Sequence, residues 1–179
     1  MELKGSKTEK NLLAAFAGES QAHTKYLYYA KLARKDGYSQ IADIFEETAK
    51  NEQRHARIWY NMLHEGTPLH TNDNLKDAAA REHYEWRDMY AKFSQTALEE
   101  GFAHISALFQ QVGKIEKSHE ERFEKLLESI VQGTVFTRAE QADWICSSCG
   151  HIHQGPQPPE QCPVCGEKRG HFHLRAENY

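Results

Sequence analysis

Apolar side chains recur at steps of three and four residues from residue 6 to about residue 132, the spacing of one face of an α-helix. In the segment KNEQRHARIW this face also carries Glu52 and His55. A similar segment, GKIEKSHEERF, occurs at positions 113–123 and places Glu116 and His119 on an apolar face. Ionisable side chains are seldom buried without a partner, so two such pairs indicate a functional cause.

The start and stop signals predict two helices in the first part of this region. Ser6 and Glu9 form a capping box that opens the first helix. Gly37 ends that helix and leaves Ser39 as the N-cap of the second, which runs to about residue 65.

Two more helices are predicted beyond a loop with the sequence GTPLHTNDN. The third helix runs to about Glu100, and Gly101 separates it from the fourth, which ends near Gly133. Four helices of roughly 27 to 30 residues predict a four-helix bundle.

Every predicted helix carries at least one glutamate on its apolar face, near the middle of the helix. Helix one carries Glu19, and helix three carries Glu82 and Glu85. The interval from Glu19 to Glu52 matches the interval from Glu82 to Glu116 to within one position. Each interval corresponds to one helix and a turn, so the bundle contains an internal repeat of two-helix units.

Bound metal explains these inward acids better than any other partner. Ionised carboxylates are costly in a low-dielectric interior unless they are paired or bind metal, and no Lys or Arg lies on these faces. Five carboxylates with two imidazoles suit a pair of divalent or trivalent iron or manganese ions. The seven candidate ligands are Glu19, Glu52, His55, Glu82, Glu85, Glu116 and His119.

The ligand pattern resembles that of ferritin-like di-iron and di-manganese proteins, in which two helices give one glutamate each and two give Glu-x-x-His. One residue breaks the repeat, because Ala22 follows Glu19 by three positions whereas Glu85 follows Glu82. We interpret Glu85 as a carboxylate that can replace the His55 nitrogen when the charge of the ion changes. The alternative is that Glu85 only accepts a hydrogen bond from a ligand.

Composition and charge exclude some classes of function. The net charge of −4 gives no reason to expect nucleic-acid binding, which is usually a property of basic proteins. The N-terminus MELKGSKTEK has no apolar signal core, and apolar stretches such as LLAAFAG are too short to cross a membrane. A soluble cytoplasmic protein without membrane partners is therefore expected.

The C-terminal part of the sequence contains all four cysteines as two C-x-x-C pairs, separated in the pattern C-x2-C-x12-C-x2-C. Without a secretion signal this spacing favours metal over disulfides. The motif alone is equally typical of iron and zinc, but a neighbouring redox-capable metal pair favours iron. We predict a bundle at residues 1–134, a linker at 135–140 and a metal-binding module at 141–179. The four expected ligands are Cys146, Cys149, Cys162 and Cys165.

With both parts described, nearly the whole chain resembles the rubrerythrins. The resemblance implies a mainly α fold, a ferritin-like four-helix bundle with a small C-terminal rubredoxin-like β module. It implies two iron ions on the seven bundle ligands, with Glu85 alternating with His55, and a third iron in an Fe(Cys)4 site. It also places Tyr26 and Tyr90 near the di-iron site as catalytic residues.

The implied activity is that of a non-haem peroxidase, which reduces hydrogen peroxide to water and protects against oxidative stress. Electrons would come from an external donor, rubredoxin or a reductase, through the Fe(Cys)4 centre. The alternatives are a ferritin-like ferroxidase that handles iron and, outside enzymes, a zinc-ribbon interaction module on a metal-free bundle.

The connection between helices two and three is short for this bundle. The two helices run parallel in ferritin-like proteins, so the chain must return by roughly 33 Å along the bundle. The loop from Gly66 to Asn72 spans only about 23 to 29 Å. Either helix two unwinds by about a turn, or the helix pairs exchange between the chains of a homodimer.

Overall fold

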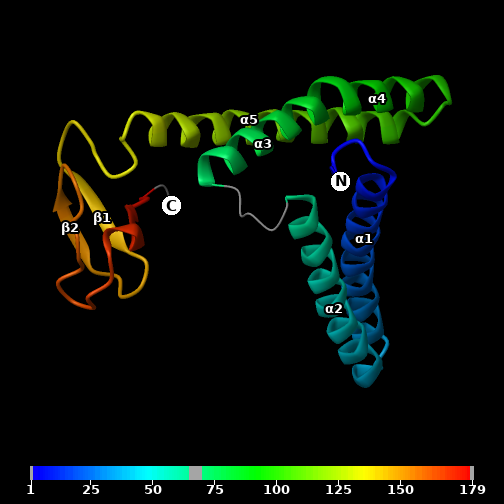
Figure 1. Ribbon diagram of the computed structural model, residues 1–179, viewed down its shortest axis with the longest axis horizontal. Helices are drawn as coiled ribbons and strands as arrows, with labels where there is room; N and C mark the ends of the chain where they lie inside the picture. Colours follow the sequence, from blue (N-terminus) through cyan, green and yellow to red (C-terminus); the bar gives the residue numbers. More distant parts are fainter. Residues whose placement is uncertain (1, 65–69, 178–179) are drawn as a thin grey trace. The chain divides into compact units, whose positions relative to one another are not determined.

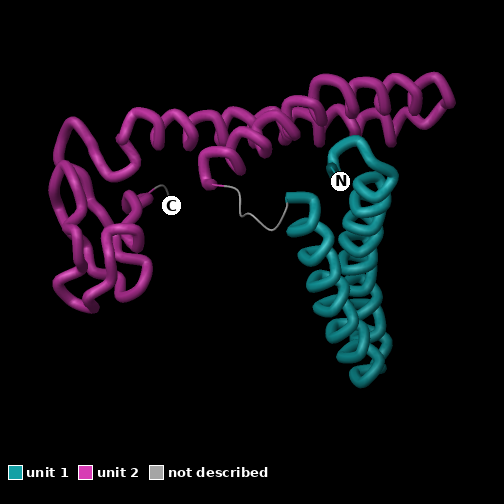
Figure 2. The backbone as a smooth tube through the Cα atoms, viewed as in Figure 1, with its two compact units in different colours: residues 1–69 teal, residues 70–179 magenta. Residues whose placement is uncertain are grey.

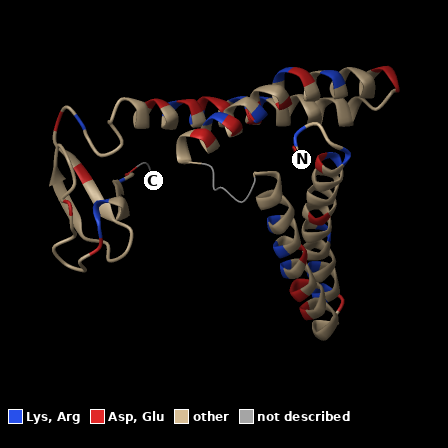
Figure 3. Cartoon of the chain, viewed as in Figure 1, with Lys and Arg blue, Asp and Glu red and all other residues tan. Residues whose placement is uncertain are grey.

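The computed structural model describes residues 2–64 and 70–177, which form two compact units, residues 1–69 and 70–179 (Figure 2). The order of helices and strands is shown in Figure 1. Acidic and basic side chains are intermixed along the helices of each unit (Figure 3).

The first unit is a pair of packed helices, α1 (Lys7–Lys35) and α2 (Ser39–Leu63). The predicted cap is confirmed, because the Ser6 hydroxyl accepts a hydrogen bond from the Glu9 backbone N–H at 3.0 Å. Gly37 has φ of 88° and ends α1 as expected, since this left-handed conformation favours glycine. The prediction for Ser39 was wrong, because Tyr38 is the N-cap and Ser39 is already the first helical residue.

The second unit begins with α3 (Thr71–Tyr84), a π-helical turn η1 (Glu85–Met89) and α4 (Tyr90–Glu99), which together form the third predicted helix. They pack against α5 (Ala103–Val131). Part of the predicted loop GTPLHTNDN is helical, because α3 starts at Thr71 with His70 as its N-cap. The rest of that loop up to residue 69, and the predicted end of the second helix at about residue 65, lie outside the described residues.

The helix pairs bury small side chains where their two members meet. In the first unit the buried helical residues are five alanines, three of them on α2. In the second unit they are Ser94, Ala97, Ser106 and Gly113, and the hydroxyls of Ser94 and Ser106 hydrogen-bond at 2.9 Å. Large apolar side chains are exposed on both units, among them Ile41, Met62, Phe93, Ile105 and Leu126.

The C-terminal part of the second unit is a three-stranded antiparallel sheet in the order β2-β1-β3. Its strands are β1 (Ala142–Cys146), β2 (Ile152–Gly155) and β3 (Phe172–Leu174), the last preceded by a 3-10 turn, η2 (Arg169–His171). Trp144 is 1% exposed and packs with Cys146, Cys162 and Phe172. Its indole N–H donates to the Gly155 carbonyl at 3.0 Å.

The predicted fold class, mainly α with a small C-terminal β module, is confirmed. Among the residues that the structure describes, no helix is both long enough and apolar enough to span a lipid bilayer.

Candidate functional site

The first unit brings three of the predicted ligands together between α1 and α2. His55 Nδ1 lies 2.9 Å from Glu52 Oε2 and 4.0 Å from Glu19 Oε1. Glu52 and His55 are neighbours because residues three apart share a helix face. His23 fixes α1 against α2 one turn away, because its Nδ1–H donates to the Ala49 carbonyl at 2.8 Å.

The second unit repeats this arrangement between α3 and α5. His119 Nδ1 lies 2.8 Å from Glu116 Oε2 and 3.9 Å from Glu82 Oε2. The corresponding distances in the two units are nearly equal, so the internal repeat seen in the sequence is also a repeat of side-chain geometry.

These two groups have the chemistry and the spacing of metal ligands. In each, the three ligand atoms lie within 4.8 Å of one another. Two ligand atoms that bind one ion at a right angle, each about 2.1 Å from the ion, would lie about 3 Å from each other. Carboxylate and imidazole donors suit iron. The two groups therefore fit one ion each, with three ligands per ion supplied by a single unit.

The clustered carboxylates also affect each other's protonation. Burial, and then the neighbouring carboxylate of Glu116, raise the pKa of Glu82. A cation at this position would remove the repulsion that raises the pKa, because the negative charges would then have a positive partner.

Glu85 turns toward an arginine that sequence reasoning missed. The Arg81 Nε–H donates to Glu85 Oε1 at 2.6 Å, and the Glu85 side chain is 19% exposed. Arg81 precedes Glu85 by four positions, and this spacing is the signal that could have identified the pair. Glu85 thus lies near the group of Glu82, Glu116 and His119 and is paired with Arg81, and its predicted role as an alternating ligand stays a prediction.

The π-helical turn changes the face of the helix on which Tyr90 lies. Tyr90 follows Glu85 by five residues, which an α-helix would place on a different face. The Tyr90 backbone N–H bonds to the Glu85 carbonyl, so the turn is wider by one residue and Tyr90 lies closer to the Glu85 face. Burial, and then the carboxylates of Glu116, Glu85 and Glu82, raise the pKa of Tyr90. Tyr90 therefore lies beside the ligand group and keeps its phenolic proton.

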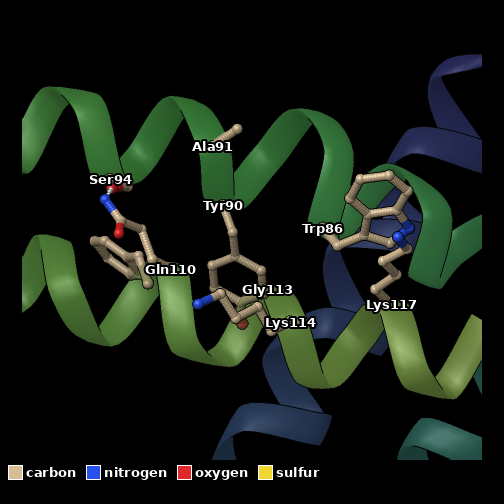
Figure 4. Close-up of a pocket in the computed structure, with 9 residues that line it drawn as sticks. Trp86, Tyr90, Ala91, Ser94, Gln110, Gly113, Lys114 and Lys117 are labelled. Atoms are coloured by element: carbon tan, nitrogen blue, oxygen red, sulfur yellow. Dashed lines mark hydrogen bonds between the residues drawn. The ribbon is translucent and has the colours of Figure 1, made fainter.

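An open pocket of about 470 Å³ reaches Tyr90 between α4 and α5 (Figure 4). The Tyr90 side chain points from α4 toward Gly113 on α5. A Cβ at Gly113 would lie 3.4 Å from the Tyr90 Cβ, so glycine allows this close approach. Lys117 lies over the Trp86 ring at the other end of the pocket, 5.4 Å from its centre.

Tyr26 is half-buried on α1 and contacts other rings. Its ring centre lies 6.1 Å from that of Phe45 and 6.0 Å from that of Tyr29. Its predicted role near the metal ions stays a prediction.

A second group that sequence reasoning missed flanks the ligands on α3, η1 and α5. Glu120 accepts hydrogen bonds from His83 Nδ1 at 2.7 Å and from the Trp86 indole N–H. Burial opposes ionisation of Glu120, but these two hydrogen bonds outweigh it and lower its pKa. Each member directly follows a predicted ligand in the sequence, which is the signal that could have found the group. Such contacts orient ligand-bearing helices.

The four cysteines meet at one end of the sheet. The Cys146 and Cys165 sulfurs are 3.7 Å apart, as are those of Cys149 and Cys162. Four sulfurs at the corners of a tetrahedron, each about 2.3 Å from a metal ion, would be about 3.8 Å apart. The spacing fits a tetrahedral ion.

Backbone N–H groups prepare the cysteine site for negative charge. Burial raises the pKa of Cys162, but the backbone N–H groups of Cys165 and Val164 outweigh it and bring the pKa to about 7. The N–H of His151 favours the thiolate of Cys149, but burial and the neighbouring thiols raise its pKa to about 12. Four thiols at this distance cannot all ionise without a cation, so the site requires a metal ion to hold four thiolates.

Comparison with known protein families matches both parts of the chain. Residues 10–127 match the family described as Rubrerythrin, and residues 144–173 match the one described as Rubrerythrin, rubredoxin-like domain. The chain belongs to the rubrerythrin family. Rubrerythrin of Porphyromonas gingivalis is 43% identical over 99% of this chain and 94% of its own length. Rubrerythrin of Nitratidesulfovibrio vulgaris is 42% identical over 99% of this chain and 98% of its own length.

Nigerythrin of Nitratidesulfovibrio vulgaris is 34% identical over 92% of this chain and 85% of its own length. A solved structure of the mixed-valent state of nigerythrin has 34% identity, covers 97% of this chain and 91% of the other, and gives a TM-score of 0.36.

Membership in the rubrerythrin family confirms the resemblance and the predicted cofactors. Rubrerythrins have a di-iron carboxylate site and a rubredoxin-like Fe(Cys)4 site, and this chain has Glu and His groups and four clustered cysteines that fit them. Members of the family are oxidoreductases that act under oxidative stress and use rubredoxin-type electron donors. Which residue binds which iron, and the domain limits at 134 and 141, stay predictions.

Proposed function

We propose that this rubrerythrin is a peroxidase that reduces hydrogen peroxide to two molecules of water, with two electrons and two protons consumed in each turnover. When bound, two irons on the bundle ligands would supply the two electrons, and an iron held by Cys146, Cys149, Cys162 and Cys165 would supply their replacement. The observation that supports the proposal best is that a metal-ligand group and a proton-holding tyrosine lie together in the second unit.

The bundle ligands hold the two irons in this proposal. Glu19, Glu52 and His55 would hold one ion and Glu82, Glu116 and His119 the other, and Glu85 would be the carboxylate that can take the place of His55. The hydrogen bond from Arg81 supports this role, because it gives the Glu85 carboxylate a second resting position.

Protons come from side chains of this chain. Tyr90 keeps its proton because burial and three carboxylates raise its pKa, so its hydroxyl can donate to a peroxide oxygen. The pocket that reaches Tyr90 offers space for a substrate of this size. We include Tyr26 as a second proton donor on the strength of the family resemblance.

The Cys149→Ser variant tests the relay. Cys149 is an exposed ligand of the cysteine site, so its loss should change the Fe(Cys)4 centre without touching the bundle. We expect steady turnover with an external reductant to fall by about 100-fold or more. Oxidation of the chemically reduced bundle by one equivalent of peroxide should stay within about two-fold of wild type, because ligands in the bundle are unchanged.

Ser148→Ala is the matched control, because it changes the same C-x-x-C segment without removing a ligand, and it should behave as wild type. Equal loss of turnover and of single oxidation in Cys149→Ser would contradict the relay. A wild-type protein that oxidises and stores ferrous iron but does not consume peroxide catalytically would favour the ferroxidase function instead.

A further inference from the structure

The segment between α5 and β1, residues 132–141, joins the helices of the second unit to the sheet that holds the cysteines (Figure 1). Part of it, residues 135–140, is the linker predicted from the sequence. A linker allows the parts that it joins to move relative to each other unless contacts hold them. This segment makes contacts of that kind with the end of α5 and with the sheet.

The end of α5 fixes the direction of the chain that follows it. Gly133 has φ of 68°, and its backbone N–H bonds to the Ile130 carbonyl at 3.1 Å. The Thr134 backbone N–H bonds to the Ser129 carbonyl at 2.8 Å, and the Thr134 hydroxyl donates to the same carbonyl at 3.4 Å. Two backbone bonds of this kind around a left-handed glycine form a Schellman motif. Thr134 is therefore held in place by the last turns of α5.

The Arg138 side chain bonds back to this helix end. Its Nη1 donates to the Thr134 and Thr137 carbonyls, each at 2.6 Å. The Thr137 backbone N–H also bonds to the Thr134 carbonyl at 3.3 Å, which closes a turn over residues 134–137. Hydrogen bonds from a charged donor are roughly twice as strong as those between neutral groups. The guanidinium therefore ties residue 138 firmly to the end of α5.

The same residue is also bonded to the sheet. The Arg138 backbone N–H donates to the carbonyl of Pro156, directly after β2, at 2.8 Å. The guanidinium carbon lies 5.5 Å from the centre of the Trp144 ring, a favourable cation–π distance. Phe136 packs against the core around Trp144, which includes two of the cysteines. The segment is thus joined to the part of the sheet that supports the cysteine site.

Arginine has the shape that these contacts need. The guanidinium is a flat group with several N–H donors in fixed directions, so its edge can serve two carbonyls while its face lies over a ring. Arg138 forms no ion pair with any residue that the structure describes, so its charge is used for these carbonyls and this ring. Lysine carries a point charge on a flexible chain and lacks the flat fork.

We infer that Arg138 is a positioning residue that clamps the sheet with the cysteine site to the end of α5, the helix that carries Glu116 and His119. One residue holds both partners, because its guanidinium bonds to the helix end and lies over Trp144. Residues 133–138 are then a fixed joint instead of a flexible tether. The inference rests on the relay of the proposed function and deepens it, because two sites that work together must be held in a constant arrangement.

Hydrogen exchange of the iron-loaded, full-length protein tests whether the joint is fixed. In the wild type the bonded backbone N–H groups of Thr134, Thr137 and Arg138 should exchange slowly. In Arg138→Ala, exchange in a peptide that covers 134–140, measured by mass spectrometry, should be about 10-fold faster or more, while exchange in β1 stays within about two-fold. Arg138→Lys keeps a cation near the ring but not the fork, so its exchange should lie between the two.

The matched control is Lys125→Ala, which removes an exposed cation from the last turns of α5 and should exchange as the wild type does. All of these variants should keep the red absorbance of ferric thiolate, because the four cysteines are unchanged. If Arg138→Ala loses this absorbance, Arg138→Lys alone decides the test. Fast exchange of 134–140 in the wild type, or no difference between the Arg138 variants and Lys125→Ala, would overturn the joint.

The red absorbance also measures what the joint does for the relay. Fully reduced protein is mixed with excess peroxide in a stopped-flow instrument, and oxidation of the bundle and appearance of the red colour are followed separately. In Arg138→Ala the red colour should appear about 10-fold more slowly or worse, whereas oxidation of the bundle should stay within about two-fold of wild type. A residue that only stabilises the sheet would leave both rates unchanged.

The two ideas fail in different ways in this experiment. Equal rates of red colour in the wild type and in Arg138→Ala would overturn the positioning role of Arg138. A wild type in which the bundle is oxidised but the red colour does not follow would instead contradict the relay of the proposed function.

Discussion

Single residues beside the ligands decide how the ligand side chains lie. Arg81 donates a hydrogen bond to Glu85, and Glu120 joins α5 to the turn that carries Trp86. Both contacts come from residues that a search for inward acids omits, because Arg81 and Glu120 lie off the apolar lines. Spacing predicts which side chains share a helix face, whereas the orientation of Glu85 toward Arg81 required a structure.

The Glu85→Ala variant tests the role of this carboxylate. Six bundle ligands remain, so we expect two bundle irons to stay bound. Oxidation of the reduced bundle by peroxide should slow by about 10- to 100-fold, because the iron that gains charge loses its extra carboxylate. Iron assay and stopped-flow absorbance measure the two effects.

Asp88→Ala is the control for this change, because it removes an exposed acid from the same turn. An unchanged oxidation rate in Glu85→Ala would instead mean that Glu85 only accepts a hydrogen bond.

The π-helical turn is the element that sequence periodicity could not reveal. A regular α-helix through residues 71–99 would place Met89 in line with Glu85. The structure places Tyr90 there instead, since the turn contains one more residue and shifts the register of α4. The helices α1, α2 and α5 are regular along their described lengths. Both ends of α1 and of α5 and the start of α2 were predicted to within about two residues, Ser39 being the first helical residue instead of the cap.

Deleting one residue from this turn should affect stability much less than inserting one. Deleting Asp88 makes Tyr90 the fourth residue after Glu85, so the same hydrogen bond becomes α-helical and α4 keeps its face toward α5. We expect the free energy of unfolding to change by less than about 1 kcal/mol. Inserting an alanine after Asp88 rotates α4 and moves Ser94 and Ala97 out of the α4–α5 contact, which should cost about 2 to 4 kcal/mol.

Thermal and urea unfolding of the two length variants measure this difference. Equal destabilisation by deletion and insertion would mean that the wide turn itself, and not the register that it sets, is needed for folding.

At the scale of the whole molecule, two kinds of metal centre depend on different parts of the chain. The cysteine centre is contained in one small sheet, and its ligands Cys146 and Cys162 belong to the core around Trp144. The bundle ligands are divided between two helix pairs. Both ligand sets can be predicted from the sequence because the spacing within Glu-x-x-His and C-x-x-C is local, whereas that spacing says nothing about how the two helix pairs meet.

Zinc in place of iron at the cysteine site separates its structural role from its redox role. Zinc binds four thiolates tetrahedrally at about 2.3 Å, so it should hold the sheet and the Trp144 core as iron does. Zinc does not change its oxidation state, so it cannot pass electrons.

Protein produced with zinc in this site and iron in the bundle should melt within a few degrees of the all-iron protein and lack the red colour of ferric thiolate. Its steady peroxide turnover should fall by about 100-fold, while one oxidation of the reduced bundle proceeds at the wild-type rate. Turnover at the all-iron rate would show that electrons reach the bundle by another route, and loss of the single oxidation would show that the cysteine iron takes part in the chemistry of the bundle.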